Sequence, residues 1–220
     1  FKNKKIALCA GNIATPEAAK FLLKLGVDII KVGIGPGSIC TTRLVAGIGV
    51  PQLSAILSVR NGIKNKNIKI IADGGIKYSG DLAKAFAAGA DAVMIGSLFA
   101  GTDEAPGKII KINGKLFKSF RGMGSVGAMN KGSADRYFQS KQKDSSKYVP
   151  EGVEGFSKYK GDVGNIIQKL TGGLRSSMGY LGSKQIKYLR NKPQFVKITK
   201  AGFYESMVHN VDIVKSDTKY

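Results

Sequence analysis

Two ten-residue segments of this 220-residue chain repeat one another, and the repeat restricts the possible folds more than any other feature. The segments are Lys24–Gly33 and Ala87–Gly96. Each contains a helix end, a glycine typical of a helix C-terminus, an aspartate turn, a short apolar strand and a second glycine. A helix followed by a buried strand, found twice, predicts a parallel sheet covered by helices.

The pattern extends to four strands, which we predict at residues 5–10, 29–32, 68–72 and 92–95, with helices between them. Two of these helices begin with suitable N-cap residues. Thr15 precedes a proline and an acid, and Ser79 precedes Asp81 by two positions.

Glycines and polar residues follow each predicted strand. They are Gly11-Asn12, Gly33 to Cys40, Asp73-Gly74-Gly75 and Gly96-Ser97. The carboxyl ends of strands form the active face of a β/α barrel. A doubly wound sheet normally has one such loop near its switch point rather than one after every strand. We therefore predict an α/β fold, the C-terminal half of a (β/α)8 TIM barrel, and we interpret the missing initiator Met as the sign of a fragment or a processed product.

After residue 105 the pattern changes. Asn113-Gly114 between two short apolar runs predicts a hairpin over residues 109–117. Residues 130–160 are polar and lack periodicity, which is typical of a mobile active-site flap. Helical spacing returns from 162 to 189, with an interruption expected at Gly172-Gly173.

We expect one strand in the tail, at residues 195–198, followed by a loop. The chain is thus interpreted as one partial catalytic domain, 1–220. Its parts are four βα units at 1–105, a hairpin and flap at 106–165, and a C-terminal helix and extension at 166–220.

Composition excludes several classes of protein. The net charge is +20, from 35 Lys and Arg against 15 Asp and Glu, but no basic run exceeds two residues and no aromatics are interleaved. A solvated, lysine-rich surface explains this better than nucleic-acid binding. Two cysteines and one histidine exclude a disulfide scaffold and a Cys/His zinc site. No run approaches the roughly 20 apolar residues of a membrane span.

Cys40 is the candidate nucleophile. It follows a loop with three glycines and a proline in five residues, Gly33 to Gly37, which suits backbone passing close to a ligand. We expect backbone N–H groups and Arg43 to lower the pKa of its thiol. A lone loop cysteine is more often passive, and the glycines reverse that expectation. A functional free thiol implies a reducing, cytoplasmic location, and Cys9, in an apolar strand, is expected in the core.

Two further loops suit a phosphorylated ligand. Asp73-Gly74-Gly75 and Gly96-Ser97 place small residues at strand ends, where N–H groups reach phosphate oxygens, and Asp73 is expected to accept from ribose hydroxyls. Either loop alone is explained equally well by a tight turn, but both together favour a nucleotide. Arg136-Tyr137 lies in the flap, where such a pair is more often ordinary surface.

Seven segments spread over the whole chain resemble the IMP dehydrogenase family. They are Gly33-Ile-Gly-Pro-Gly-Ser-Ile-Cys-Thr-Thr-Arg43, Gly47-Ile-Gly-Val-Pro-Gln52, Ala72-Asp-Gly-Gly75, Met94-Ile-Gly-Ser97, Arg121-Gly-Met-Gly-Ser125, Asp135-Arg-Tyr-Phe-Gln139 and Pro150-Glu-Gly-Val-Glu-Gly155. The resemblance implies oxidation of IMP to XMP with NAD+, the committed step of guanine nucleotide synthesis. Cys40 would form a covalent thioimidate that water then hydrolyses.

The resemblance also implies the site residues. IMP would be held by Ser38, Asp73, Gly74, Gly75, Gly96, Ser97, Phe120, Arg121, Gly122, Met123, Gly124 and Glu151. The nicotinamide would border Gly33, Ile34 and Gly35. Arg136 would activate water and Tyr137 would position it. Because the pKa of an arginine exceeds about 12, a second route through Thr42 and Glu151 stays open.

Potassium would bind carbonyls of Gly35, Gly37 and Cys40, and a neighbouring subunit would add those of Glu205, Ser206 and Met207, which implies a homotetramer. Phe120 stands where the family usually has tyrosine, and Met207 replaces a common histidine. The first half of the barrel and a CBS pair are expected to be absent. We therefore expect that this chain alone does not form a closed, active barrel.

Two alternatives stay open. A GMP reductase would share the cysteine loop and deaminate GMP with NADPH, but it generally lacks the motifs at 121–125 and 135–139. A non-catalytic nucleotide- or nucleic-acid-binding protein would show salt-sensitive binding that survives Cys40→Ala.

Overall fold

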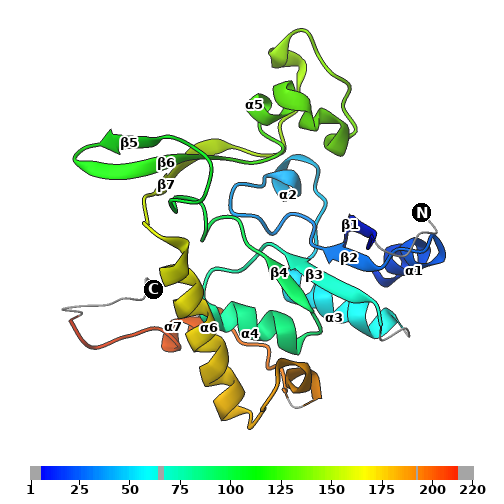
Figure 1. The fold of residues 1–220 in the computed structure, drawn as a ribbon, viewed down its shortest axis with the longest axis vertical. Helices are drawn as coiled ribbons and strands as arrows, with labels where there is room; N and C mark the ends of the chain where they lie inside the picture. The colour runs from blue at the N-terminus through cyan, green and yellow to red at the C-terminus, as the bar shows by residue number, and fades with distance from the viewer. Residues whose placement is uncertain (1–5, 64–66, 192, 213–220) are drawn as a thin grey trace.

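The computed structural model describes residues 6–63, 67–191 and 193–212. Four parallel strands form one sheet in the order β1-β2-β3-β4. The strands are β1 (Cys9–Ile13), β2 (Ile29–Val32), β3 (Lys69–Asp73) and β4 (Ala92–Met94), and the helices between them are α1 (Pro16–Lys24), α2 (Thr42–Val45), α3 (Gln52–Gly62) and α4 (Ser79–Ala87). The prediction of an α/β fold with a parallel sheet is confirmed (Figure 1).

A second, antiparallel sheet lies apart from the first and has the order β5-β6-β7 (Figure 1). Its strands are β5 (Ile109–Ile112), β6 (Lys115–Arg121) and β7 (Glu154–Lys158), and the flap between β6 and β7 holds α5 (Val126–Ala128) and short helical turns at Met129–Ser133, Ala134–Tyr137 and Ser145–Lys147. The predicted hairpin is confirmed, whereas the expectation of an unstructured 130–160 segment was wrong. Its polar residues form local turns and one strand that pairs with β6.

The C-terminal part contains α6 (Val163–Tyr180), a short helical turn η4 (Ile186–Asn191) and α7 (Lys200–Glu205). The strand expected at 195–198 does not form, because no described strand lies beside it to pair with. The sequence analysis also missed α7, although its N-cap signal is present: the Thr199 side chain accepts from Gly202 N–H at 3.2 Å. Among the described residues, no helix has the length and apolar composition needed to cross a bilayer.

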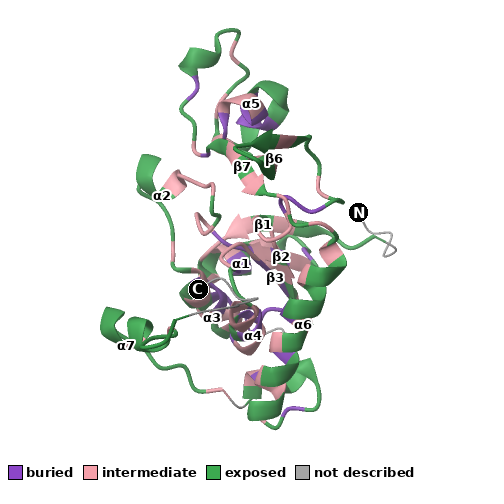
Figure 2. Cartoon of the chain, turned by 90° about the vertical axis from the view of Figure 1, so that its left-hand side faces the viewer, coloured by how far each residue is buried: buried purple, intermediate pink, exposed green. Residues whose placement is uncertain are grey.

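The hydrophobic core lies between the two central strands and their helices. Ile30 and Val32 of β2, Ile70 of β3 and Val59 of α3 are fully buried (Figure 2). Helices cover the two central strands, as their near-continuous apolar runs predicted.

The first strand differs from its prediction in position and in burial. Pairing with β2 begins only at Cys9, opposite Ile29, because the chain before Asp28 is still turning out of α1. β1 therefore covers 9–13 rather than 5–10, and the first five residues lie outside the described ones. Cys9 is exposed rather than part of the core, since β1 has a neighbour on one side only among the described residues.

The two adjacent glycines in α6 do not interrupt it. The helix runs continuously through Gly172 and Gly173. A Cβ on Gly173 would clash with the Ser79 side chain at the start of α4, whereas one on Gly172 would meet nothing within 4 Å. Close packing of α6 on α4, around Leu82 and Leu170, accounts for the second glycine.

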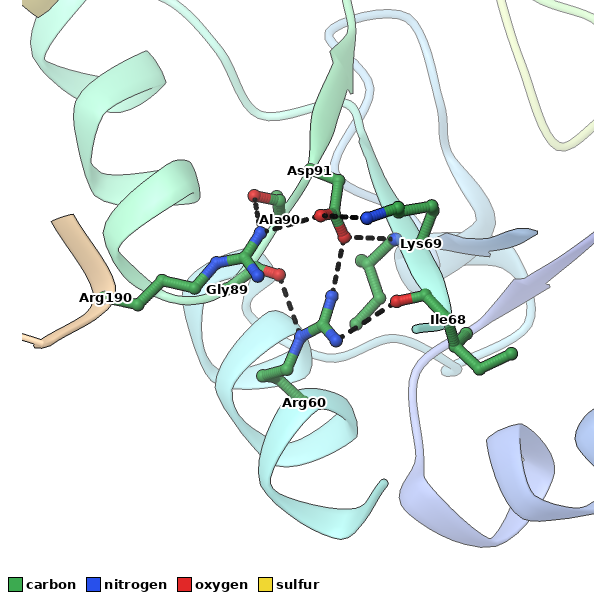
Figure 3. Close-up of polar contacts among 8 residues, drawn as sticks. Arg60, Ile68, Lys69, Gly89, Ala90, Asp91 and Arg190 are labelled. Carbon is green, nitrogen blue, oxygen red and sulfur yellow. Dashed lines mark hydrogen bonds and ion pairs between the residues drawn. The ribbon is translucent and has the colours of Figure 1, made fainter. Parts of the chain in front are cut away.

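One carboxylate joins four elements at the amino end of the parallel strands (Figure 3). Asp91 accepts from the Ile70 backbone N–H at 2.9 Å, from Arg60 at 2.7 Å and from Arg190 at 3.0 Å, with Lys69 at 3.7 Å. Burial alone would raise the pKa of Asp91, but the bonds from Ile70 and Arg190 and the charge of Arg60 outweigh it, so the pKa lies below its ordinary value. The network connects α3 and η4 to the strands.

Candidate active site

The loops after β2 and β3 meet at the carboxyl end of the sheet. A Cβ on Gly33 would clash with the Asp73 carbonyl, so close approach of the two strand ends requires this glycine. Gly74, at φ +92°, lies against Pro36, whose Cγ would be 2.9 Å from an added Cβ. The structure thus brings together the cysteine loop and the Asp73-Gly74-Gly75 loop, as predicted from strand order.

Cys40 is half-buried at the end of its loop. Its thiol donates to the Thr42 hydroxyl at 3.2 Å, and its N–H donates to the Gly37 carbonyl at 3.2 Å. A hydroxyl at this distance can hold the sulfur in one orientation. It can also take part in moving a proton.

Arg43 connects the cysteine loop to the segment before α3. Its guanidinium donates to the carbonyls of Ile34 at 3.3 Å and Val50 at 2.6 Å. Its stem passes between Gly35 and Gly49, where added Cβ atoms would lie 2.6 Å and 2.5 Å from its Cγ. These contacts hold the backbone of the loop that leads to Cys40.

A backbone ladder joins the cysteine loop to the flap. On one side, Thr41 N–H donates to the Glu151 carbonyl at 2.9 Å, and Val153 N–H donates to the Ile39 carbonyl at 3.0 Å. On the other side, Glu151 N–H donates to the Gly124 carbonyl at 3.0 Å. Gly122 N–H completes the ladder by donating to the Val153 carbonyl at 3.0 Å. Three segments far apart in the chain therefore form one small sheet around Cys40.

The helical turn at 134–137 places Tyr137 beside this ladder. Its ring packs on Gly124, where an added Cβ would lie 2.8 Å from Tyr137 Cζ. Burial raises the pKa of the Tyr137 phenol, and the nearby negative charges of Cys40 and Glu151 raise it further against the opposing charge of Arg136. The phenol therefore stays protonated next to the candidate nucleophile. The predicted residues Cys40, Thr42, Tyr137 and Glu151 are thus close together.

Asp73 has two partners that the sequence analysis did not assign. Lys31 Nζ lies 3.1 Å from its carboxylate, and the Asn12 amide donates to it at 2.9 Å and to the Gly33 carbonyl at 3.0 Å. Asn12 was visible as a polar residue next to a predicted strand end. Lys31 was visible as a charge inside an apolar strand. Both hold the Asp73 carboxylate in place.

Five of the predicted nucleotide contacts line a cavity of about 1320 Å³ between the antiparallel sheet, the loop after β4 and the flap. They are Gly96, Phe120, Arg121, Gly122 and Met123, and Arg136 of the flap lines it with them. The other predicted nucleotide contacts and the nucleophile do not line it: Ser38, Asp73, Gly74, Gly75, Ser97, Gly124, Glu151 and Cys40. The ladder that contains Gly122 is thus where the thiol loop and this cavity adjoin.

The carbonyls predicted for potassium lie in two regions. Glu205 ends α7, and Ser206 and Met207 follow it. α7 lies away from α2, the helix directly after the cysteine loop, in both views (Figures 1 and 2). One chain does not bring the two sets together. Within the described ranges, no three His, Cys, Asp or Glu side chains are grouped to hold a metal ion.

Comparison with known proteins gives consistent results. A family model described as the IMP dehydrogenase / GMP reductase domain matches residues 1–209. Inosine-5'-monophosphate dehydrogenase of Methanocaldococcus jannaschii is 58% identical over 98% of this chain and 45% of its own length. The Bacillus subtilis protein of the same name is 54% identical over 98% of this chain and 44% of its own length. The chain spans less than half of these relatives.

A solved structure shares the fold. The crystal structure of a GMP reductase variant from Trypanosoma brucei, in complex with guanosine 5'-monophosphate, matches with a TM-score of 0.85 and 48% identity. It covers 94% of this chain and 42% of the other.

Proposed function

Since this chain belongs to the IMP dehydrogenase / GMP reductase family, we propose that it supplies the nucleophile and flap for oxidation of IMP to XMP with NAD+. The observation that carries the proposal is the backbone ladder that holds Cys40, Glu151 and Gly124 together with Tyr137. The Cys40 thiol, the Thr42 hydroxyl, Glu151 and the phenol of Tyr137 are neighbours, which supports the proposal.

The first step is addition of the Cys40 sulfur to C2 of the hypoxanthine ring. The hydrogen on C2 then leaves as a hydride, which NAD+ accepts when bound, and a thioimidate on Cys40 remains. In the second step water attacks the same carbon, the carbon–sulfur bond breaks, and XMP is released with one proton to be removed.

The flap residues support the second step. Tyr137, kept protonated by its raised pKa, is suited to orienting the attacking water. Arg136 is one acceptor for the proton of this water. The other acceptor is the Thr42 hydroxyl, 3.2 Å from the sulfur, together with Glu151.

The residues fit the substrate, cofactor and cation in part. Asp73 is oriented by Lys31 to accept from ribose hydroxyls. Ile34 is the one side chain among Gly33 to Gly35, so the loop can border a flat nicotinamide ring. Carbonyls of Gly35, Gly37 and Cys40 are the oxygen donors that an alkali cation takes.

A partner subunit would complete the cation site, because α7, which ends at Glu205, lies away from α2 of the same chain (Figures 1 and 2). This supports a homotetramer. The free thiol supports a cytoplasmic location.

The second candidate is reduction of GMP, because a GMP reductase is among the solved structures that match, at 48% identity. Deamination would still use Cys40, but it would not require a hydrolytic flap. The contact of Tyr137 with the Cys40 ladder therefore favours the dehydrogenase.

The experiment is NADH formation at 340 nm from IMP, NAD+ and K+, with the chain joined to an upstream half-barrel. Cys40→Ala should abolish it, and the matched variant Cys9→Ala should not. Absence of NADH from a folded tetramer would exclude the proposal, and GMP with NADPH would then test the second candidate.

A further inference from the structure

The loop after β4, residues 96–105, is held by the antiparallel sheet. Seven of its carbonyls accept hydrogen bonds from Lys118 of β6, Ser157 of β7 or Lys160, which follows β7. The acceptors are the carbonyls of Ser97, Leu98, Ala100, Gly101, Thr102, Asp103 and Ala105. The shape of this loop is therefore decided by residues more than ten positions away.

Lys160 makes the contacts nearest to the proposed nucleotide residues. Its Nζ donates to the carbonyls of Ser97 at 2.6 Å, Leu98 at 2.9 Å and Ala100 at 2.8 Å. Three acceptors match the three N–H donors of an ammonium group. The Ser157 hydroxyl donates to the same Ala100 carbonyl at 2.7 Å. These bonds fix the backbone directly after Gly96.

Lys118 supports the other end of the loop. It is buried, and its Nζ donates to the carbonyls of Thr102, Asp103 and Ala105. Charge-assisted hydrogen bonds offset the cost of burying an ammonium group. The loop is thus attached to the sheet by a lysine at each end.

The strands of the antiparallel sheet also lead directly into the backbone ladder beside Cys40. β6 ends at Arg121, directly before Gly122 to Gly124, and β7 begins at Glu154, directly after Val153. One sheet therefore sets the position of Ser97 relative to Cys40. We infer that Lys160 is a positioning residue, which fixes the Ser97 backbone for recognition of the phosphate of a nucleoside monophosphate.

The inference rests on the assignment of Gly96 and Ser97 to the substrate in the proposed function. The matched variants are Lys160→Met and Lys158→Met. Each removes one positive charge, and Lys158 is an exposed residue of β7. Both variants keep an unbranched side chain. They differ in that only Lys160→Met loses the hydrogen bonds to the carbonyls of Ser97, Leu98 and Ala100.

Calorimetry would measure binding of IMP and of inosine, which lacks the phosphate, to the chain joined to an upstream half-barrel. Lys160→Met should lower IMP affinity about tenfold, the loss expected for charge-assisted hydrogen bonds. The affinity for inosine should change less than about twofold, since inosine has no phosphate to contact the loop after β4. KM for IMP should rise by the same factor with kcat unchanged, because phosphate contacts are equal in ground and transition states. Lys158→Met should match the unaltered protein.

Equal losses for IMP and inosine, or no loss for IMP, would overturn the inference. Lys160→Arg is the second variant, in case Lys160→Met does not fold. Its planar group keeps the charge but fits three carbonyls less well, and a loss of about threefold confined to IMP is expected.

Binding does not require turnover, so missing NADH formation would count against the proposed function alone. Equal affinity of the unaltered protein for IMP and inosine would overturn the inference about Lys160.

Discussion

Single side chains carry the chemistry, and Tyr137 shows how their surroundings adjust it. Burial and the neighbouring negative charges of Cys40 and Glu151 raise its pKa above the ordinary value of 10.0. A folded pKa above the unfolded one means that the protonated phenol adds stability below about pH 10. That contribution is lost as the pH rises through the folded pKa. Tyr137 therefore remains a hydrogen-bond donor at neutral pH.

Tyr137→Phe should slow hydrolysis and leave oxidation intact. We expect the first burst of one NADH per Cys40 to be retained and the steady-state rate to fall roughly a hundredfold, as for loss of a proton-handling group. Rapid-mixing absorbance at 340 nm measures both phases. Tyr78→Phe, at the start of α4, is the control and should leave both phases unchanged. Loss of the burst would place Tyr137 in the oxidation step instead.

At the level of the elements, the packing of α6 on α4 decides whether each of the two glycines in α6 can be replaced. Gly172→Ala should stabilise α6 by about 0.5–1 kcal/mol, because alanine is the better helix former and meets nothing within 4 Å. Gly173→Ala should destabilise by about 1–3 kcal/mol, because its Cβ would clash with Ser79 of α4. Urea unfolding of the two variants checks the pair. The same sign for both would contradict this packing.

Asp91 connects elements by charge. Asp91→Asn should cost about 2–3 kcal/mol, since two arginines lose their counter-ion. Lys69→Met, which removes an exposed partner 3.7 Å away, should cost less than about 0.5 kcal/mol. Because the folded pKa of Asp91 is lowered, its contribution is present above the unfolded value of about 3.9 and is lost as the pH falls through the folded value. Measuring the free energy of unfolding of both variants between neutral and acid pH tests this. The difference between Asp91→Asn and the unaltered protein should shrink at low pH.

For the whole molecule, the parallel sheet has an unpaired edge at β1 and another at β4 among the described residues. Apolar side chains near the first edge are exposed, including Ile6 and Phe21. We expect the chain on its own to bind a hydrophobic dye and to form aggregates, and the chain joined to an upstream half-barrel to bind no dye and to form nothing larger than the proposed tetramer. Dye fluorescence and light scattering distinguish the two. A cooperative melt together with turnover by the chain alone would contradict the expectation.

The sequence by itself determined the local and periodic features of this protein. Glycine spacing and apolar runs located β2, β3 and β4 to within a residue or two. Strand order then implied that the loop before Cys40 and the loop at Asp73 lie at the same edge of the sheet, because parallel strands end there. The family resemblance supplied the identities of Arg136, Tyr137 and Glu151 as candidate site residues.

Only the tertiary structure decided which long-range contacts these residues make. Nothing local in the sequence reveals that β7 pairs with β6, that Arg43 donates to the carbonyls of Ile34 and Val50, or that the contact with Ser79 requires Gly173. Cys9 is exposed for the same reason, since burial depends on which elements lie beside a strand. Such contacts join groups tens of residues apart, and their energies depend on distances that residue order does not contain. The contacts of Lys160 with three carbonyls are also long-range contacts that only the tertiary structure decides.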